Sequence, residues 1–403
     1  MVPPWCRSGE PIAVRSRPVR PRTPPESRVA GHDRLRTVGA ALVALALMAG
    51  TAAACAGSGG GDSASAPPGS DLPDATKPPD TPQPTSTEPA AESLGSGNQV
   101  TFAFGGDVHF EKELRTLLDR DPSTVLAPQQ AVLARADIAM VNLETAITTR
   151  GTAAVKDFTF RAPPAAFTAL AAAGVDVATV ANNHGLDYGP VGLADTLAAA
   201  KAADFPIVGI GATAAEAYAP WRTTVNGQRV AVIGATQVID SQYITAWSAT
   251  DTHAGLASAK NVERLVAAVQ SARSDSDTVV VYLHWGTERV SCPNPQQKEL
   301  AAALQSAGAD IIIGSHAHVL LGGGMLDNAF VAYGLGNYFF YATVGNGADS
   351  GVVTVQATGR RIDGYQFVPA HISGGQARTL TGSAADAAVK AWTALRPCTG
   401  LTP

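Results

Sequence analysis

Residues 311–322, IIIGSHAHVLLG, place two histidines one residue apart after a run of isoleucines. The apolar run Ile311 to Ile313 predicts a buried strand, and the Gly-Ser pair ends it. His316 and His318 therefore follow the C-terminal end of a strand, which is the edge where open α/β sheets bind ligands. Taken alone, the stretch also allows two solvent-exposed loop histidines, so the rest of the chain must decide.

Composition sets the first limits on function. The 403 residues are 45% hydrophobic, which suffices for one large domain or two. The formal net charge of −5 argues against a nucleic-acid partner, because nucleic-acid binders carry basic stripes. The four cysteines (Cys6, Cys55, Cys292 and Cys398) form no CxxC pair, which excludes a zinc ribbon or a thioredoxin-like site.

The N-terminal part has the pattern of an export signal. An Arg- and Pro-rich flank precedes TVGAALVALALMAGTAAAC (37–55), an apolar run that ends in small residues. We expect a lipoprotein-type signal peptide over 1–54, with Cys55 as the lipidation site. A plain signal peptide or an uncleaved anchor helix is the alternative. A lipid on Cys55 would tether the chain to the outer face of the cell membrane, outside the cytoplasm.

Three further segments follow the signal. Residues 55–97 are rich in Gly, Pro and Ser and predict a disordered stalk. A folded domain is expected over 98–372, and a C-terminal segment with a short helix over 373–403. In an exported protein Cys292 and Cys398 are candidates for a disulfide that ties this segment down, and two free thiols are the alternative.

Strand and helix patterns alternate between residues 98 and 315, which predicts an α/β fold with antiparallel strands added late in the chain. Strands are expected at 99–107, 136–144, 175–184, 205–211, 277–285 and 309–315. Helices are expected at 111–135, 163–174, 190–203, 260–273, 295–307 and 384–395. An Asn-Gly turn within 223–235 predicts a hairpin.

Residues that can bind metal gather where five of these strands end. They are Asp107 and His109; Asn142 and Glu144; Asn182, Asn183 and His184; His284; and His316 with His318. Each position alone has an ordinary explanation, such as a helix cap, a turn or a buried histidine. Their recurrence at strand C-termini, which takes in five of the eight histidines, favours one shared site.

Several motifs point to one family. GGDVHF, VNLETAIT, FTFRAPP, VATVANNHGLDYG, LHWGTE, GADIIIGSHAHV and YGLGNYFF occur in this order between about residues 98 and 345. The chain thereby resembles bacterial capsule-synthesis proteins of the CapA, or poly-γ-glutamate biosynthesis, type, within the calcineurin-like metallophosphatase superfamily. This resemblance implies a four-layer αββα sandwich with mixed sheets and a dinuclear metal site at the strand ends.

The resemblance also implies roles for single residues. The first metal would be held by Asp107, His109 and His318, and the second by Asn183, His284 and His316. Glu144 stands where the superfamily has an aspartate that bridges both metals. His184 matches the histidine that acts as general acid or stabilises transition-state charge.

Three positions depart from the family pattern. Many CapA-like proteins have an apolar residue where His109 stands, so this chain has the fuller set of metal ligands. Glu144 is one methylene longer than the usual aspartate, which could alter the spacing of the metals. Ala317 replaces a frequent proline, so the loop between the two histidines is expected to be looser.

The ligand types suit two divalent transition-metal ions, Mn, Fe or Zn. Two such ions act as a clamp on a phosphoryl group and lower the pKa of a bridging water. Residues that could orient histidines or meet substrate are Asn142, Arg161, Asp187, Glu288 and Asn337. Capping or solvent-exposed roles are equally open for Arg161, Asp187 and Glu288.

Three functions remain open from the sequence. The first is a metal-dependent hydrolase of a phosphoester or an envelope polymer. The second is an accessory subunit of an anionic-polymer synthase or export complex that has no catalysis of its own. The third is a binding module with structural metals. The expected partners are an anionic polymer or phosphoester, polymer-synthase or export proteins, and the membrane.

Overall fold

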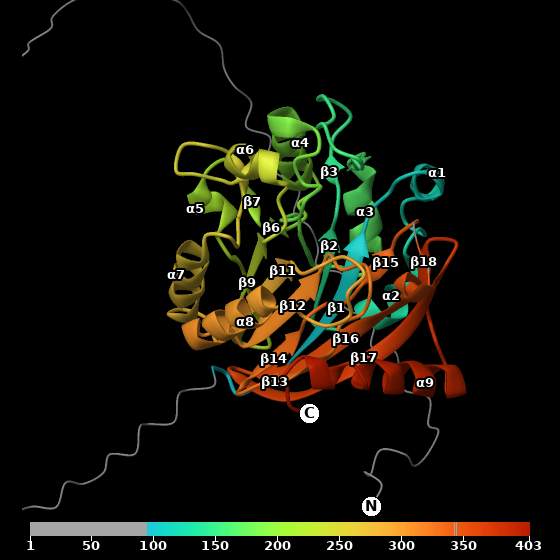
Figure 1. Ribbon diagram of the computed structural model, residues 1–403, viewed down its shortest axis with the longest axis vertical. Helices are drawn as coiled ribbons and strands as arrows, with labels where there is room; N and C mark the ends of the chain where they lie inside the picture. The colour runs from blue at the N-terminus through green and yellow to red at the C-terminus, as the bar shows by residue number, and fades with distance from the viewer. Residues whose placement is uncertain (1–94, 342, 344) are drawn as a thin grey trace, which may run out of the picture. The chain divides into compact units, whose positions relative to one another are not determined.

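The computed structural model describes residues 95–403, except residues 342 and 344. The expected signal peptide over 1–54, Cys55 and the expected stalk up to residue 94 lie outside the described residues. Two β-sheets form the centre of the described part, with helices on their outer faces (Figure 1).

The first sheet has eight strands in the order β15-β18-β17-β16-β1-β2-β5-β6. The four strands β1, β2, β5 and β6 run parallel, whereas β16, β17 and β18 are antiparallel. Their bounds are β1 (Val100–Val108), β2 (Ile138–Leu143), β5 (Val177–Thr179), β6 (Ile207–Val208), β15 (Asn337–Phe339), β16 (Asp349–Thr358), β17 (Arg361–Ser373) and β18 (Gln376–Thr379).

The second sheet has six strands in the order β13-β14-β12-β11-β9-β8, of which β9, β11, β12 and β14 are parallel. Their bounds are β8 (Trp221–Val225), β9 (Gln228–Thr236), β11 (Thr278–His284), β12 (Ile311–Ser315), β13 (Gly323–Leu326) and β14 (Ala329–Ala332). The β8–β9 hairpin turns at Asn226 and Gly227, which both have positive φ as a type I′ turn requires. Two small sheets pair β3 (Ala146–Ile147) with β4 (Arg161–Ala162), and β7 (Ile210–Gly211) with β10 (Gly255–Leu256).

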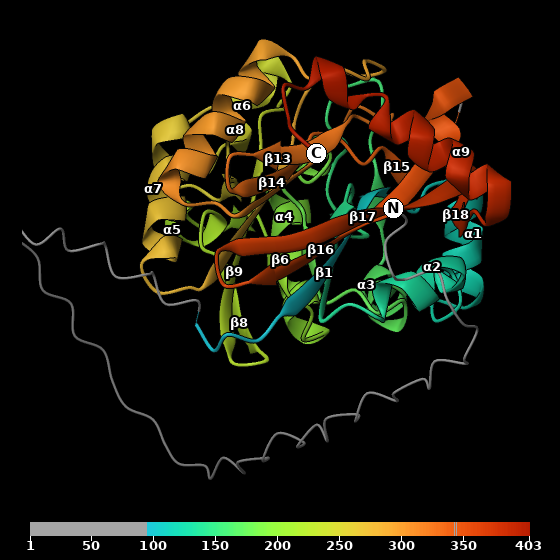
Figure 2. The same cartoon turned by 90° about the horizontal axis from the view of Figure 1, so that it is seen from below.

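Three apolar cores separate four layers. Between the sheets, Phe102 and Phe104 of β1 pack in one cluster with Ile311 and Ile313 of β12. The intervening Ile312 faces the opposite way, toward the helices α7 (Val262–Arg273) and α8 (Pro295–Ala307). The outer face of the first sheet packs against α1 (Glu113–Arg120), α2 (Ala127–Leu133), α3 (Ala165–Ala172) and α4 (Gly189–Ala202) (Figure 2). This arrangement is the expected αββα sandwich, and it explains why the isoleucine run is apolar on both faces.

The expected helix over 111–135 is wrong as one element, because the structure has α1 and α2 there. Asp121 precedes Pro122 and is extended (φ −160°, ψ 96°), as the residue before proline prefers, so α1 ends there. The sequence pattern also does not predict the short helices, because three or four residues are too few to show the period of an amphipathic helix. They are α5 (Ala214–Ala217), α6 (Ile244–Trp247) and the 3₁₀ turns Ser241–Tyr243, Gly345–Ala348 and Arg396–Cys398.

Residues 373–403 belong to the same packed unit as the preceding chain. β18 pairs with β17 across the boundary expected after residue 372. The last helix, α9 (Gly382–Thr393), stacks Trp392 on Phe367 of β17 at a ring-centroid distance of 4.8 Å. Among the described residues, no helix combines the length and the apolar character needed to cross a bilayer.

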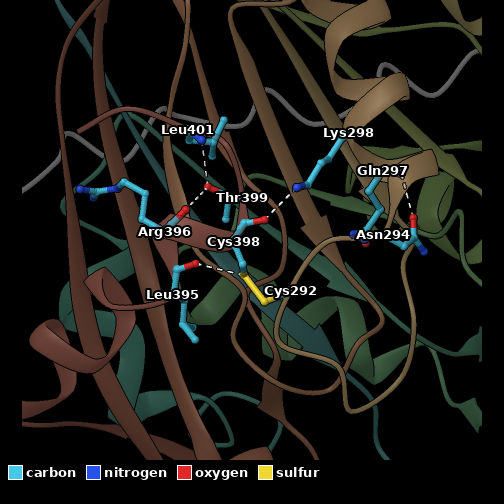
Figure 3. The surroundings of a disulfide bond; sticks show 9 residues. All are labelled: Cys292, Asn294, Gln297, Lys298, Leu395, Arg396, Cys398, Thr399 and Leu401. Carbon is cyan, nitrogen blue, oxygen red and sulfur yellow. Dashed lines mark hydrogen bonds between the residues drawn. A yellow bond between two sulfur atoms is a disulfide. The ribbon is translucent and has the colours of Figure 1, made fainter.

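A disulfide joins Cys292 to Cys398, with the two Cα atoms 5.7 Å apart (Figure 3). Lys298 of α8 donates from Nζ to the carbonyl oxygen of Cys398 at 2.8 Å. The pairing expected from the sequence is therefore present in the structure, and it ties the C-terminal residues to the loop that follows β11.

Replacing both cysteines with alanine should lower the free energy of unfolding by about 2–5 kcal/mol, because the disulfide closes a long loop in the unfolded chain. The two residues are 106 positions apart. Urea unfolding of the full chain, with and without a reducing agent, measures the change. The reducing agent should shift the wild-type midpoint and leave the double variant unaffected. Equal midpoints for wild type and variant, or free thiols at Cys292 and Cys398 themselves in the non-reduced wild type, would contradict the prediction.

Candidate metal centre

The C-terminal ends of parallel strands from both sheets meet at one edge of the molecule. Asn142 of β2 brings its Nδ2 to 3.1 Å from Nδ1 of His284 at the end of β11. One layer deeper, the hydroxyl of Tyr282 donates to the carbonyl oxygen of Gly105 in β1 at 2.7 Å. These contacts between the sheets bring residues that are far apart in the sequence into a single cluster.

Glu144 lies at the centre of this cluster. Its side chain is fully buried, and neither carboxylate oxygen has a hydrogen-bond partner among the described residues. Three imidazole Nε2 atoms surround Oε1, that of His284 at 3.7 Å and those of His184 and His318 at 3.9 Å. Burial first, and then the neighbouring Asp107, raise the pKa of Glu144 well above its usual value. A bound cation would stabilise this carboxylate in its ionised form, so the residues present fit a metal ion.

One group of ligand atoms is spaced as if it surrounds a single ion. Nε2 of His284 lies 2.8 Å from Oδ1 of Asn183, 3.1 Å from Nδ1 of His316 and 3.7 Å from Glu144. Ligands that each stand about 2.0–2.2 Å from one metal are separated by about 3–4 Å. The residues that the family resemblance assigns to a second metal thus lie together in the structure.

Asp107 contacts both histidines that follow β12. Oδ2 of Asp107 is 3.4 Å from Nδ1 of His318, and the backbone N–H of His316 donates to the same oxygen at 3.2 Å. In each of two groups of residues, the possible ligand atoms all lie within 4.8 Å of one another. The groups are Asp107, Glu144 and His284, and Glu288, His316 and His318. The described residues can therefore hold metal ions, as expected from the donor types.

Two histidines of the cluster, His284 and His316, are kept neutral. Burial is the main cause that lowers the pKa of His284 well below its usual value and that of His316 to about 3. The neutral imidazole has the lone pair that binds a metal. Amides orient two rings of the cluster, because Oδ1 of Asn337 lies 2.9 Å from Nδ1 of His318 and Nδ2 of Asn142 lies 3.1 Å from Nδ1 of His284.

His184 stands beside the ligands with its own set of partners. Its Nδ1 lies 2.5 Å from Oδ2 of Asp187, and its backbone N–H donates to Oδ1 of Asn182 at 3.0 Å. This leaves Nε2 directed toward Glu144. The imidazole can accept or give a proton there, while Asp187 fixes the tautomer and the ring orientation.

His109 does not join the ligand groups. Its ring lies between aromatic side chains, 4.7 Å from Phe160, 4.2 Å from Phe340 and 4.7 Å from Tyr341 by centroid. Both ring nitrogens face backbone amides, Nδ1 that of Glu111 at 3.1 Å and Nε2 that of Tyr341 at 3.3 Å. In this conformation the ring packs as an aromatic side chain.

A cavity of about 350 Å³ opens onto the cluster, lined among others by Lys156, Phe160, His184, Glu288 and His318. The sequence prediction missed Lys156, which is 8% exposed and lies 3.0 Å from Asp187 and 3.3 Å from Asp240. The available signal was its position two residues before the FTFRAPP motif.

Arg161, in contrast, is not among the residues that line this cavity. Its guanidinium lies over the ring of Tyr188 at 4.7 Å, and its backbone N–H donates to Glu111. The structure thus gives Arg161 a packing role, whereas Lys156 is a positively charged residue that lines the cavity together with His184.

The sequence of this chain is similar to those of known proteins. The family model described as "Bacterial capsule synthesis protein PGA_cap" matches residues 101–342. The capsule biosynthesis protein CapA of Bacillus anthracis is 34% identical over 217 residues, which cover 53% of this chain and 52% of that protein. A Mycobacterium tuberculosis (strain CDC 1551 / Oshkosh) protein described as a probable polyglutamine synthesis accessory protein is 31% identical over 189 residues, 45% of this chain and 50% of that one.

The chain therefore spans about half the length of the curated relatives it matches. Among solved structures, the Thermus thermophilus sulfate thiohydrolase SoxB superposes with a TM-score of 0.41 at 15% identity, over 75% of this chain and 62% of that chain. The family match covers more than half of the chain and contains every strand-end residue of the candidate metal centre. The chain belongs to the family of bacterial capsule synthesis proteins PGA_cap.

Proposed function

We propose that this chain is a metal-dependent hydrolase that acts in the synthesis or export of a poly-γ-glutamate type anionic polymer. The observation that carries the proposal is the position of His184. It stands beside a cluster of metal ligands, lines the cavity that opens onto them, and is oriented by Asp187. A purely structural metal site does not require such a residue, which favours catalysis over a binding module.

The chemistry of the site follows from its donors. Two divalent ions, Mn, Fe or Zn, would be held by Asp107, Glu144, Asn183, His284, His316 and His318. When bound, they would supply Lewis acidity toward a phosphoryl or carbonyl oxygen and lower the pKa of a water molecule.

The remaining steps belong to the residues of the chain. Asp187 accepts a hydrogen bond from Nδ1 of His184, so Nε2 is the atom that exchanges a proton with the leaving group. Lys156 balances the charge of Asp187 and donates to the carbonyl oxygen of Asn183 at 2.5 Å, which holds the Asn183–His184 segment in place. Phe160 stacks on the His184 ring at 4.0 Å and covers one of its faces from water.

A second candidate function is an accessory subunit of a polymer synthase or export complex. It is supported by the name of the Mycobacterium tuberculosis relative, a probable polyglutamine synthesis accessory protein. In that role the cavity would bind the anionic polymer, and partner proteins would carry out the chemistry.

His184→Ala should retain bound metal and lower hydrolytic turnover by about 10²–10⁴-fold, because a general acid–base group contributes by that factor. Phosphodiester and poly-γ-glutamate substrates, together with metal analysis of the same samples, measure both quantities. His371→Ala is the matched control, since His371 is exposed on β17. Unchanged turnover in His184→Ala would contradict the role of His184. Absence of turnover in metal-loaded wild type would favour the accessory role.

The proposed location is the outer face of the cell membrane, through a lipid on Cys55. Cys55→Ser should release the chain from the membrane or leave its precursor unprocessed, since the serine side chain has no thiol to which the lipid can be attached. Membrane fractionation and the mass of the mature N-terminus check this. A variant that fractionates and migrates like wild type would show that Cys55 is not the anchor.

A further inference from the structure

The ring of His109 is not among the grouped ligand atoms, so the candidate metal centre lacks one of the ligands that the family resemblance assigns to it. Both of its ring nitrogens face backbone amides, and its ring is packed between Phe160, Phe340 and Tyr341. His109 is absent from both groups of closely spaced ligand atoms. To reach a metal, the ring would have to leave this aromatic packing, in which it is fully buried.

Glu288 lies where the missing ligand is needed. A carboxylate oxygen of Glu288 lies within 4.8 Å of a ring nitrogen of His316 and of one of His318. Glu288 also lines the cavity. Glu144, whose two carboxylate oxygens have no hydrogen-bond partner among the described residues, belongs to the other group of ligand atoms. Carboxylates from both groups would then balance the charge of bound cations.

The backbone holds Glu288 against the two histidines. The N–H of Arg289 donates to the carbonyl oxygen of Ala317 at 2.8 Å, which ties the loop after β11 to the turn after β12. Arg289, His316 and His318 all have positive φ (61°, 93° and 55°). Left-handed non-glycine residues are costly, and they gather at functional sites where the surrounding structure holds them.

We propose that Glu288, and not His109, is the direct ligand that completes the centre next to His316 and His318. The inference rests on the proposed metal site and goes beyond it by naming a ligand from the loop after β11. The exchange replaces a neutral nitrogen donor by an anionic oxygen. Such a centre, with Asp107 and Glu144, is richer in carboxylate and suits a harder ion such as Mn²⁺ better than an all-imidazole set does.

Titration of the metal-stripped full chain with Mn²⁺, with free Mn²⁺ followed by electron paramagnetic resonance, tests the assignment. Glu288→Gln removes the charge of the side chain and keeps its size. Glu299→Gln is the matched control, because Glu299 is exposed on α8. His109→Phe preserves the aromatic packing. We expect Glu288→Gln to weaken one Mn²⁺ site by more than about 100-fold, which exceeds the roughly 10–100-fold loss from an orienting residue. His109→Phe and Glu299→Gln should bind like wild type.

Wild-type affinity in Glu288→Gln, or a lost site in a folded His109→Phe protein, would overturn the inference and leave the metal centre standing. A wild-type chain that binds no Mn²⁺, Fe²⁺ or Zn²⁺ would overturn both. If His109→Phe does not fold, as thermal unfolding would show, the comparison of Glu288→Gln with Glu299→Gln still decides the assignment.

Discussion

The carboxylate of Glu144 is buried without a hydrogen-bond partner among the described residues, and the site is arranged around it. An ionised carboxylate in such a position costs several kcal/mol unless a cation or proton accompanies it. The imidazoles of His184, His284 and His318 all present Nε2 to the same oxygen, and burial keeps the pKa of His284 and His184 low. A metal cation would balance this charge, and the described residues supply the donors to hold one.

The two-sheet fold makes this arrangement possible. Parallel strands of both sheets end at one edge, and the ends of β1, β2, β5, β11 and β12 each carry one or two of the candidate ligands. The contact of Asn142 with His284 fixes the sheets relative to each other at that point. Around this rigid centre lie the more individual parts of the site: Lys156 on the loop that precedes β4, and Glu288 after β11. These loops define the cavity and are where we expect substrate preference within the family to be decided.

The strand ends were predictable because apolar runs and their period indicate strands, and parallel strands share an edge. The isoleucines before His316 are the clearest case. The role of His109 was not predictable, because the sequence gives the residue type and not the side-chain direction, which Phe160 and Tyr341 decide here. Lys156 was missed because a lysine is normally exposed, and only the fold brings Asp187 and Asp240 to it. The single long helix expected after β1 is interrupted at Pro122, because the residue before a proline disfavours the helical conformation.

The most direct test of this account is a crystal structure of the chain grown with Mn²⁺, with anomalous diffraction measured at the manganese absorption edge. The account predicts two anomalous peaks about 3.5–4 Å apart, both within bonding distance of the Glu144 carboxylate. One peak should lie toward Asn183, His284 and His316, and the other toward Asp107 and His318. The absence of any anomalous peak next to Glu144, or ions bound elsewhere with this carboxylate left uncoordinated, would contradict the claim that Glu144 binds the metal ions.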